Sequence, residues 1–237
     1  MSRSGVRALP LAAAAALALC VAVWPGAEPA VAQDGPIADS RFAGLTWTFA
    51  RVEYEAWRMP RNRFVTPEDE PWYIDAPAAE QNLSRRLRTV TAIHVNEPVT
   101  LAIEDPELWK FPWLYLVEPG ELRFREAEVP ILREFLLRGG TLTFDDFHGP
   151  AEWANMEREM RRVFPDRRIV DLPPTHPIYS CFYRLDGFPQ TPGLGSFLYG
   201  RTWEMGGFDA KLRAIEDDTG RAMVLINWNT DMGDGWE

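Results

Sequence analysis

Cysteine and histidine are scarce in this chain of 237 residues, which has two cysteines and three histidines. Once an N-terminal signal is removed, Cys181 is the only thiol, so no internal disulfide is expected. We expect Cys181 to be a buried core thiol on a strand, because it lies in an apolar run. Positive charge is also scarce: 25 lysine and arginine residues stand against 35 acidic residues, a formal net charge of −10. Nucleic-acid binding is not expected, because phosphate neutralisation requires a basic surface.

Several motifs that would identify an enzyme are absent from the sequence. No strand is followed by the Gly-x-Ser-x-Gly or Gly-x-Cys-x-Gly pattern of a nucleophile elbow. A Gly-x-Gly-x-x-Gly motif between strand and helix, a phosphate-binding Gly-Lys-Ser/Thr, a Cys-x-x-Cys pair and a His-Glu-x-x-His motif are also missing. The sequence therefore names no reaction.

The N-terminal segment has the three parts of a secretory signal peptide. Arg3 and Arg7 precede an apolar run from Leu9 to Val23, and the small residues Ala30-Val31-Ala32 follow. We expect export by the general secretion route, cleavage after Ala32, and a periplasmic or secreted protein. The apolar run is shorter than the roughly 20 residues that span a bilayer. No membrane span is expected after cleavage, and an uncleaved anchor is the alternative.

The rest of the chain predicts one domain. We expect residues 1–32 to be the signal peptide, residues 33–44 a flexible leader, and residues 45–237 a single α/β domain. Strand patterns lie at 45–54, 99–103, 113–117, 141–144, 168–172, 178–184 and 222–227, and helix patterns at 79–91, 126–138, 149–164 and 208–216. Such alternation predicts a sandwich with a mostly parallel central sheet. Ligands of these sheets bind beyond the carboxyl ends of the strands.

The segment after the predicted strand 141–144 is the strongest candidate for chemistry. Asp145, Asp146 and His148 stand between that strand and a helix, and Glu118 ends the preceding strand. Carboxylates beside an imidazole suit a metal site or general acid–base catalysis. The alternative is structural, with either aspartate capping the helix or fixing the loop.

Further polar residues are expected near a ligand: Glu152, Asn155, His176, Asn227 and Asp231. Glu152 also suits a first helical turn, where the helix dipole favours acids. His176 alternatively orders its own loop. The run that begins at Asn227 resembles a calcium loop, but Met232 stands where that loop needs glycine. We therefore interpret this run as a loop at the carboxyl edge of the sheet, beside Asp145.

Nine short motifs are distributed over residues 45–237. They are Phe49-Ala50-Arg51-Val52, Asn82-Leu83-Ser84-Arg85-Arg86-Leu87, Tyr115-Leu116-Val117-Glu118-Pro119-Gly120, Leu136-Leu137-Arg138-Gly139-Gly140, Phe144-Asp145-Asp146-Phe147, Glu152-Trp153-Ala154-Asn155, Val163-Phe164-Pro165-Asp166, His176-Pro177-Ile178, and Asn227-Trp228-Asn229-Thr230-Asp231-Met232-Gly233-Asp234. Together these motifs resemble DUF4159, a family of uncharacterised bacterial proteins.

The resemblance implies a fold similar to flavodoxin-like and class I glutamine amidotransferase-like domains, and it implies no activity. The elbow that carries the amidotransferase cysteine would fall near Asp145-Asp146, where no thiol stands, so glutaminase activity is not expected. The family domain continues past Gly233-Asp234-Gly235-Trp236-Glu237 into a further helix. The resemblance therefore implies that this chain stops short of the end of the domain.

The favoured hypothesis is an exported, non-enzymatic domain that binds a small ligand or a partner protein of the cell envelope. An aromatic loop with Trp57, Trp72 and Tyr73 would assist the acidic residues in binding. No cofactor is expected, and a divalent metal is left open.

The alternative hypothesis is a metal-assisted hydrolase that uses Glu118, Asp145, Asp146 and His148. Convergence of the carboxylates of Glu118, Asp145, Asp146 and Asp231 on one site would favour the enzyme. Their dispersal into caps and salt bridges would argue against it.

Overall fold

A computed structural model describes residues 44–57 and 66–236 of the chain. The predicted signal peptide (1–32), the leader up to residue 43 and residues 58–65 of the proline-rich segment lie outside the described residues. The described residues all belong to one compact unit. Among these residues, no helix is both long and apolar enough to cross a bilayer.

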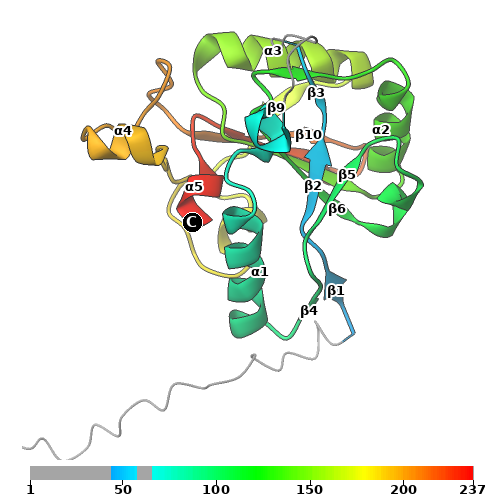
Figure 1. The fold of residues 1–237 in the computed structure, drawn as a ribbon, viewed down its shortest axis with the longest axis horizontal. Coiled ribbons are helices and arrows are strands. Elements are labelled where there is room, and N and C mark those ends of the chain that lie inside the picture. The colour runs from blue at the N-terminus through cyan, green and yellow to red at the C-terminus, as the bar shows by residue number, and fades with distance from the viewer. Residues whose placement is uncertain (1–43, 58–65, 237) are drawn as a thin grey trace, which may run out of the picture. The chain divides into compact units, whose positions relative to one another are not determined.

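The described residues form a mixed α/β fold (Figure 1). The strands are β1 (Thr46–Trp47), β2 (Ala50–Glu53), β3 (Glu55–Ala56), β4 (His94–Val95), β5 (Val99–Ala102), β6 (Trp113–Val117), β7 (Leu122–Arg123), β8 (Thr141–Asp145), β9 (Ile169–Asp171), β10 (Lys211–Glu216) and β11 (Ala222–Trp228). The helices are α1 (Ala78–Val90), α2 (Glu128–Leu137), α3 (Gly149–Val163), α4 (Leu194–Leu198) and α5 (Met232–Trp236), with 3-10 turns η2 (Pro67–Asp69), η3 (Pro71–Tyr73), η4 (Pro106–Lys110) and η5 (Pro177–Ser180).

The central sheet has seven strands in the order β5-β2-β6-β8-β11-β10-β9. Neighbouring strands from β5 to β11 are parallel, whereas β10 is antiparallel to both β11 and β9. The predicted mostly parallel sheet is therefore confirmed. The strand order changes direction at β2, because β5 lies on one side of it and β6 on the other.

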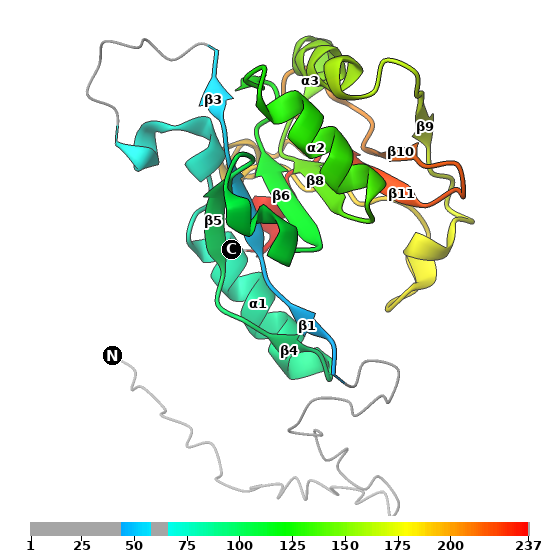
Figure 2. The same ribbon diagram turned by 90° about the vertical axis from the view of Figure 1, so that its right-hand side faces the viewer.

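Both faces of the sheet are covered, as the continuous apolar sequence of β6 predicts. Leu114 and Leu116 pack into one hydrophobic cluster with side chains of α2 and α3. Tyr115 and Val117 point to the other face, where the second cluster includes Trp236 of α5. Figures 1 and 2 show α2 and α3 on one side of the sheet and α1 with α5 on the other.

Most predicted elements are confirmed within a few residues. These are the strands expected at 99–103, 113–117, 141–144, 168–172 and 222–227 and the helices expected at 79–91, 126–138 and 149–164. The single strand expected at 45–54 is instead divided into β1 and β2, because β1 pairs with β4 in a small separate sheet whereas β2 pairs with β5 and β6 in the central sheet.

The helix predicted at 208–216 is wrong, since Lys211–Glu216 form the strand β10. Its alanine, leucine, lysine and glutamate favour a helix when taken alone. Pairing with β11 on one side and β9 on the other overrides that local preference.

The strand predicted at 178–184 is also wrong, because Pro177–Ser180 form the 3-10 turn η5. His176 caps this turn, its Nδ1 accepting a hydrogen bond from the Ile178 N–H at 3.3 Å. Only Tyr179 of the apolar run is buried in the core. Cys181 is exposed, so the prediction of a buried strand thiol is wrong as well.

Candidate functional site

An acidic site lies where three parallel strands end. Glu118 directly follows β6. Asp145 is the last residue of β8 and Asp146 directly follows it, and Asp231 comes three residues after β11. Asp75, from the segment before α1, joins them. The carboxyl ends of neighbouring parallel strands meet at one edge of a sheet, next to the point where strand order changes direction. We call Asp75, Glu118, Asp146, Asp231 and Asp234 the acidic site.

Asp145 itself ties four segments together beneath this site. Its carboxylate accepts hydrogen bonds from the Tyr115 hydroxyl at 2.7 Å and the Asn227 amide at 3.0 Å. It also accepts the backbone N–H groups of Met232 at 3.1 Å and Gly233 at 3.0 Å. Burial raises the pKa of Asp145, although all four hydrogen bonds favour the charged form. Since its acceptor positions are used inside the protein, Asp145 holds the site in place.

Asp146 faces His148 across a short contact. The distance from His148 Nε2 to Asp146 Oδ1 is 3.2 Å, and both residues are buried. Burial, followed by the charge of Asp145, raises the pKa of Asp146 well above its ordinary value. Burial also lowers the pKa of His148, against the opposing effect of nearby Glu204 and Glu152. At neutral pH this pair therefore carries less charge than two exposed side chains would.

Glu118 and Asp231 have strongly raised pKa values. Burial and the neighbouring carboxylate of Asp146 raise the pKa of Glu118 to about 9. Burial and Asp146 likewise raise the pKa of Asp231 to about 10. For both groups the charged neighbours with the largest effects are other carboxylates, so negative charge accumulates here. Protons or a cation must offset it.

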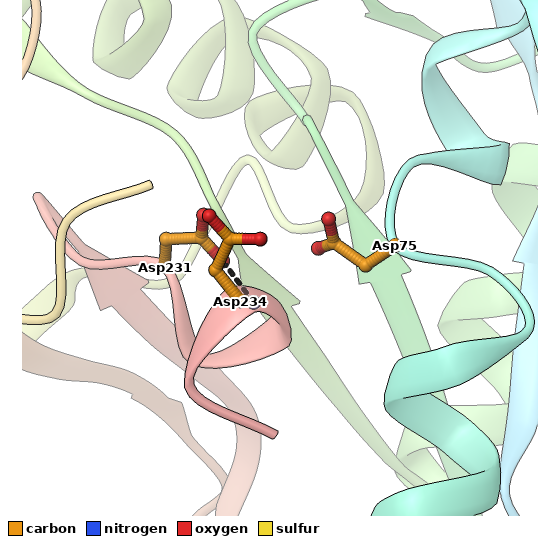
Figure 3. A group of neighbouring side chains, drawn as sticks. All are labelled: Asp75, Asp231 and Asp234. Atoms are coloured by element: carbon orange, nitrogen blue, oxygen red, sulfur yellow. Dashed lines mark hydrogen bonds between the residues drawn. The ribbon is translucent and has the colours of Figure 1, made fainter. Parts of the chain in front are cut away.

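Three carboxylates of the site come close enough to share one ion. One oxygen each from Asp75, Asp231 and Asp234 lies within 4.8 Å of the others. Figure 3 shows the Asp75 carboxylate pointing toward the other two from the opposite side. Calcium binds oxygen ligands at about 2.3–2.6 Å, so two oxygens on opposite sides of the ion stand roughly 5 Å apart. The spacing of the three oxygens is compatible with one such ion.

The backbone at the site adopts an uncommon conformation. Asp75, Glu118, Asp146 and Asn229 have positive φ angles of 62°, 54°, 50° and 63°. Such φ angles are uncommon in residues other than glycine, and non-glycine residues there cost about 1–3 kcal/mol each. Four strained residues around one site indicate that surrounding contacts hold its side chains in position.

A buried ion pair holds the segment that carries Asp75. The Arg51 guanidinium donates to both carboxylate oxygens of Glu80, at 2.9 and 2.7 Å. It also donates to the carbonyl oxygens of Trp72 and Ile74, at 3.0 and 2.9 Å. Arg51 thereby fixes the chain on both sides of Asp75. Trp72 is buried in the core, so its role in the proposed aromatic loop is structural packing.

A long connection between β9 and β10 borders the site. The Gly193 N–H donates to Glu204 at 2.7 Å, and the Leu194 N–H donates to Asp234. Asp234 also lines a hollow of about 460 Å³ together with Gln190, Thr191, Pro192, Leu194 and Phe197. The acidic site therefore adjoins a space that is partly apolar.

The structure brings most of the predicted site residues together. Glu118, Asp146, His148 and Asp231 interact at the site, with Asp145 and Asn227 directly beneath. Glu152 accepts the His148 N–H at 2.5 Å, at the start of α3. The C-terminal run lies beside Asp145, as predicted.

Two predicted residues take other positions in the fold. The Asn155 amide donates to the carbonyl oxygens of Pro119 and Leu122, at 2.8 and 2.9 Å, and so anchors the loop after β6. His176 caps η5, and no described contact joins it to the acidic site. The loop-ordering alternative given for His176 agrees with this position.

Sequence reasoning missed Asp75 and Glu204 and gave Asp234 no separate role. Asp75 stands in a proline-rich segment with no motif around it, and it reaches the site through the Arg51 contacts. Glu204 belongs to the connection before β10, outside every element that the sequence predicts. Asp234 had a local signal, since it belongs to the C-terminal run that resembles a calcium loop.

The fold and the site define an α/β domain with an acidic site at the carboxyl edge of a mostly parallel sheet. The family model for the domain of unknown function DUF4159 matches residues 48–237. The chain belongs to this family. A search among curated proteins found no match.

Proposed function

We propose that this chain is an exported, non-enzymatic binding domain whose acidic site holds a divalent cation as part of its ligand-binding surface. One observation carries the proposal: oxygens of Asp75, Asp231 and Asp234 lie within 4.8 Å of one another, beside Glu118 and Asp146. Carboxylate oxygens are the ligands that calcium, magnesium and manganese prefer.

The electrostatics of the site support a cation. Crowded, buried carboxylates repel one another, and each is stabilised either by a proton or by a positive ion. The raised pKa values of Glu118 and Asp231 mean that protons neutralise these two carboxylates when no cation is bound. A divalent ion would replace those protons, so its binding is coupled to proton release.

Thermal unfolding tests the cation site. The mature chain is unfolded after chelation and then with Ca²⁺, Mg²⁺, Mn²⁺ or Zn²⁺ in turn. A ligand that binds only the folded state stabilises it by about 2.7 kcal/mol at a hundred times its Kd. For about 200 residues this raises Tm by roughly 5–10 °C. We expect such a rise with at least one oxygen-preferring ion.

Two variants with the same chemical change make the test specific. Asp234→Asn keeps the size of the side chain but removes a charge of the three-carboxylate group. Asp105→Asn makes the same change at the start of η4, where the side chain accepts the Glu107 N–H and asparagine still can. The rise should disappear in Asp234→Asn and persist in Asp105→Asn. No rise with any ion, or an equal loss in both variants, would refute the cation site.

A metal-assisted hydrolase is the second candidate, and the convergence of Glu118, Asp146 and Asp231 favours it. The His148–Asp146 pair would supply the acid–base group. Binding is supported better, because His148 is only 5% exposed and its Nε2 faces Asp146. Turnover of an ester, amide or glycoside substrate that is lost in His148→Gln, with the cation-induced Tm rise retained, would establish the hydrolase.

The localisation rests on the signal-like segment of residues 1–32. Export through it would place the domain in the periplasm or the medium, where its partner would be a small ligand or a cell-envelope protein. Mass spectrometry of the protein from bacterial fractions tests this: an N-terminus at Gln33 supports cleavage, and an intact N-terminus in the cytoplasm refutes export.

We further propose that the fold is of the flavodoxin-like, class I glutamine amidotransferase-like type. Numbering the five parallel strands β2, β5, β6, β8 and β11 along the chain gives the spatial order 2-1-3-4-5. This order is the one that flavodoxin-like sheets share, and their ligands bind where strand order changes direction. A crystal structure with a different strand order would refute the assignment.

A further inference from the structure

A second hollow lies beside the edge of the sheet that β9 forms, between α3, β9 and β10. Its volume is about 620 Å³, and it contains none of the residues of the acidic site. Figure 2 shows β9 at the edge of the sheet, joined to α3 by a short loop. This loop and the two strands supply most of the wall.

Four arginines meet at this hollow although the chain as a whole is acidic. Arg161 comes from α3, Arg167 and Arg168 from the loop after it, and Arg213 from β10. The acidic residues of the wall are Glu157, Asp166 and Asp171, so the wall carries a net positive charge of 4 − 3 = +1.

Arg213 is held in a fixed orientation. Its guanidinium lies 4.4 Å from the Trp153 ring centroid and 4.6 Å from that of Trp228. Stacking on both rings fixes the plane of the Arg213 guanidinium, and the N–H groups at the edge of that plane can donate to an oxyanion. Its Nε forms an ion pair with Asp171 Oδ1 at 2.6 Å, and the Asp171 side chain is 60% exposed.

The other arginine ion pairs of the wall each involve at least one exposed side chain. Arg161 pairs with Glu157 at 3.0 Å. Arg167, whose side chain is 17% exposed, donates to the Glu216 carbonyl oxygen at 3.0 Å and pairs at 3.1 Å with Asp218, whose side chain is 92% exposed. Exposed pairs of this kind contribute about 0–1 kcal/mol each. Arg168 is exposed and forms no ion pair within the part of the chain that the structure describes. An anion that binds Arg168 would therefore displace no ion-pair partner among the described residues, and one that binds Arg161 would displace only an exposed pair.

Another arginine-lined hollow provides the contrast. It has a volume of about 580 Å³, and its charged lining likewise consists of four arginines and three acidic residues: Arg123, Arg125, Arg158, Arg162, Glu55, Glu126 and Glu159. The Glu159 side chain is only 4% exposed and pairs with Arg162 at 2.5 Å and Arg158 at 3.2 Å. Glu159 is thus a buried carboxylate that pairs with two of these arginines, whereas the acidic side chains of the Arg213 hollow are 34%, 58% and 60% exposed for Glu157, Asp166 and Asp171.

We propose that the hollow lined by Arg161, Arg167, Arg168 and Arg213 binds the oxyanion group of a small molecule, a phosphate or a carboxylate. Arg213 presents a preordered fork for paired hydrogen bonds, and Arg168 adds an unpaired charge. The site is separate from the acidic site, so the chain would bind an anion and a cation in different places.

Calorimetric titration of the mature chain at low ionic strength tests the proposal, with pyrophosphate and citrate as probes. We expect saturable binding of at least one probe, and the probe that binds better identifies phosphate or carboxylate as the preferred group. Loss of one charged hydrogen bond weakens binding by about tenfold, which we expect for Arg168→Gln. Because Arg168 is exposed and unpaired, this variant should fold normally.

Arg158→Gln is the matched control, since it removes the same charge from the hollow of Glu159. Its affinity for the probes should equal that of the unmodified chain. If Arg168→Gln alters the fold, the affinity of Arg213→Gln for the same probes is measured instead, and we expect it to be reduced. Absence of saturable binding up to about 10 mM, an equal loss in Arg158→Gln, or no loss in both Arg168→Gln and Arg213→Gln would overturn the proposal.

Discussion

The carboxylate of Asp145 accepts four hydrogen bonds at the candidate site. From sequence it is either a functional carboxylate or a structural one, and four hydrogen bonds place it in the structural role. Those bonds join β6, β8, β11 and α5, which are far apart in the chain. Asp145 thus links segments that are far apart in the sequence and close together in the fold.

We predict that Asp145→Asn destabilises the protein even in the presence of a chelator. The new amide NH₂ group faces donors rather than acceptors, and an unsatisfied buried polar group costs about 1–3 kcal/mol. Urea unfolding should show a loss of this order, whereas Asp105→Asn should have little effect. Unchanged stability together with lost cation binding would instead make Asp145 a ligand.

A second prediction at the residue scale concerns the buried pair of Arg51 and Glu80. Their side chains are 1% and 7% exposed, and breaking a buried pair by removing one partner costs about 3–5 kcal/mol. Glu80→Gln should therefore be strongly destabilising in urea unfolding. Glu97→Gln removes the partner of Arg88 from a surface pair with side chains 41% and 85% exposed, and should cost at most about 1 kcal/mol. Equal effects would contradict the buried-pair argument.

At the scale of elements, α5 determines the position of the acidic site. This helix donates two backbone N–H groups to Asp145 and packs Trp236 against Phe49 and Tyr115. It also lies close to Asp75, since a Cβ atom added at Gly233 would stand 2.0 Å from Asp75 Oδ2. Glycine is required there by the close approach of that carboxylate.

We predict that Gly233→Ala displaces the Asp75 carboxylate and weakens cation binding by about tenfold or more, since one charged ligand is lost. Gly195→Ala in α4 is the control, because a Cβ atom there meets nothing within 4 Å. Cation titration followed by Tm compares the two. Equal affinities in both variants would show that Asp75 is not a ligand.

At the scale of the whole molecule, the raised carboxyl pKa values give stability a definite pH dependence. The pKa of Glu118 rises from 4.5 to about 9, and that of Asp231 from 3.8 to about 10. Between these limits the folded state binds more protons than the unfolded state, so stability falls as pH increases. His148, with its lowered pKa, opposes this trend near its own titration.

We therefore predict that, in chelator, the free energy of unfolding decreases from pH 6 to pH 9. Glu118→Gln should reduce the slope, because the amide cannot ionise. A saturating divalent cation should flatten it as well, since the ion stabilises the charged carboxylates. Urea unfolding at each pH measures the slope, and stability that rises over this range in chelator would be incompatible with the arrangement.

The connection between β9 and β10 exposes several large apolar side chains on the surface of the molecule. They include Leu194, Phe197, Leu198, Tyr199 and Met205, each more than half exposed. The connection borders the acidic site through Gly193 and Glu204. Its sequence has no strong period, and the strand predicted inside it at 178–184 is wrong, because Pro177–Ser180 form η5.

The sequence by itself determined the α/β class, the parallel core strands and the segment around Asp145, because these features depend on local periodicity and on residues adjacent in the chain. The continuous apolar run of Trp113–Val117 indicates a strand buried on both faces, and this signal lies within the run itself. Only the tertiary structure decided that Lys211–Glu216 is a strand, that Asp145 is a structural hub, and that Asp75 meets Asp231 and Asp234. The physical reason is that strand pairing, buried hydrogen bonds and carboxylate repulsion act between segments far apart in the chain.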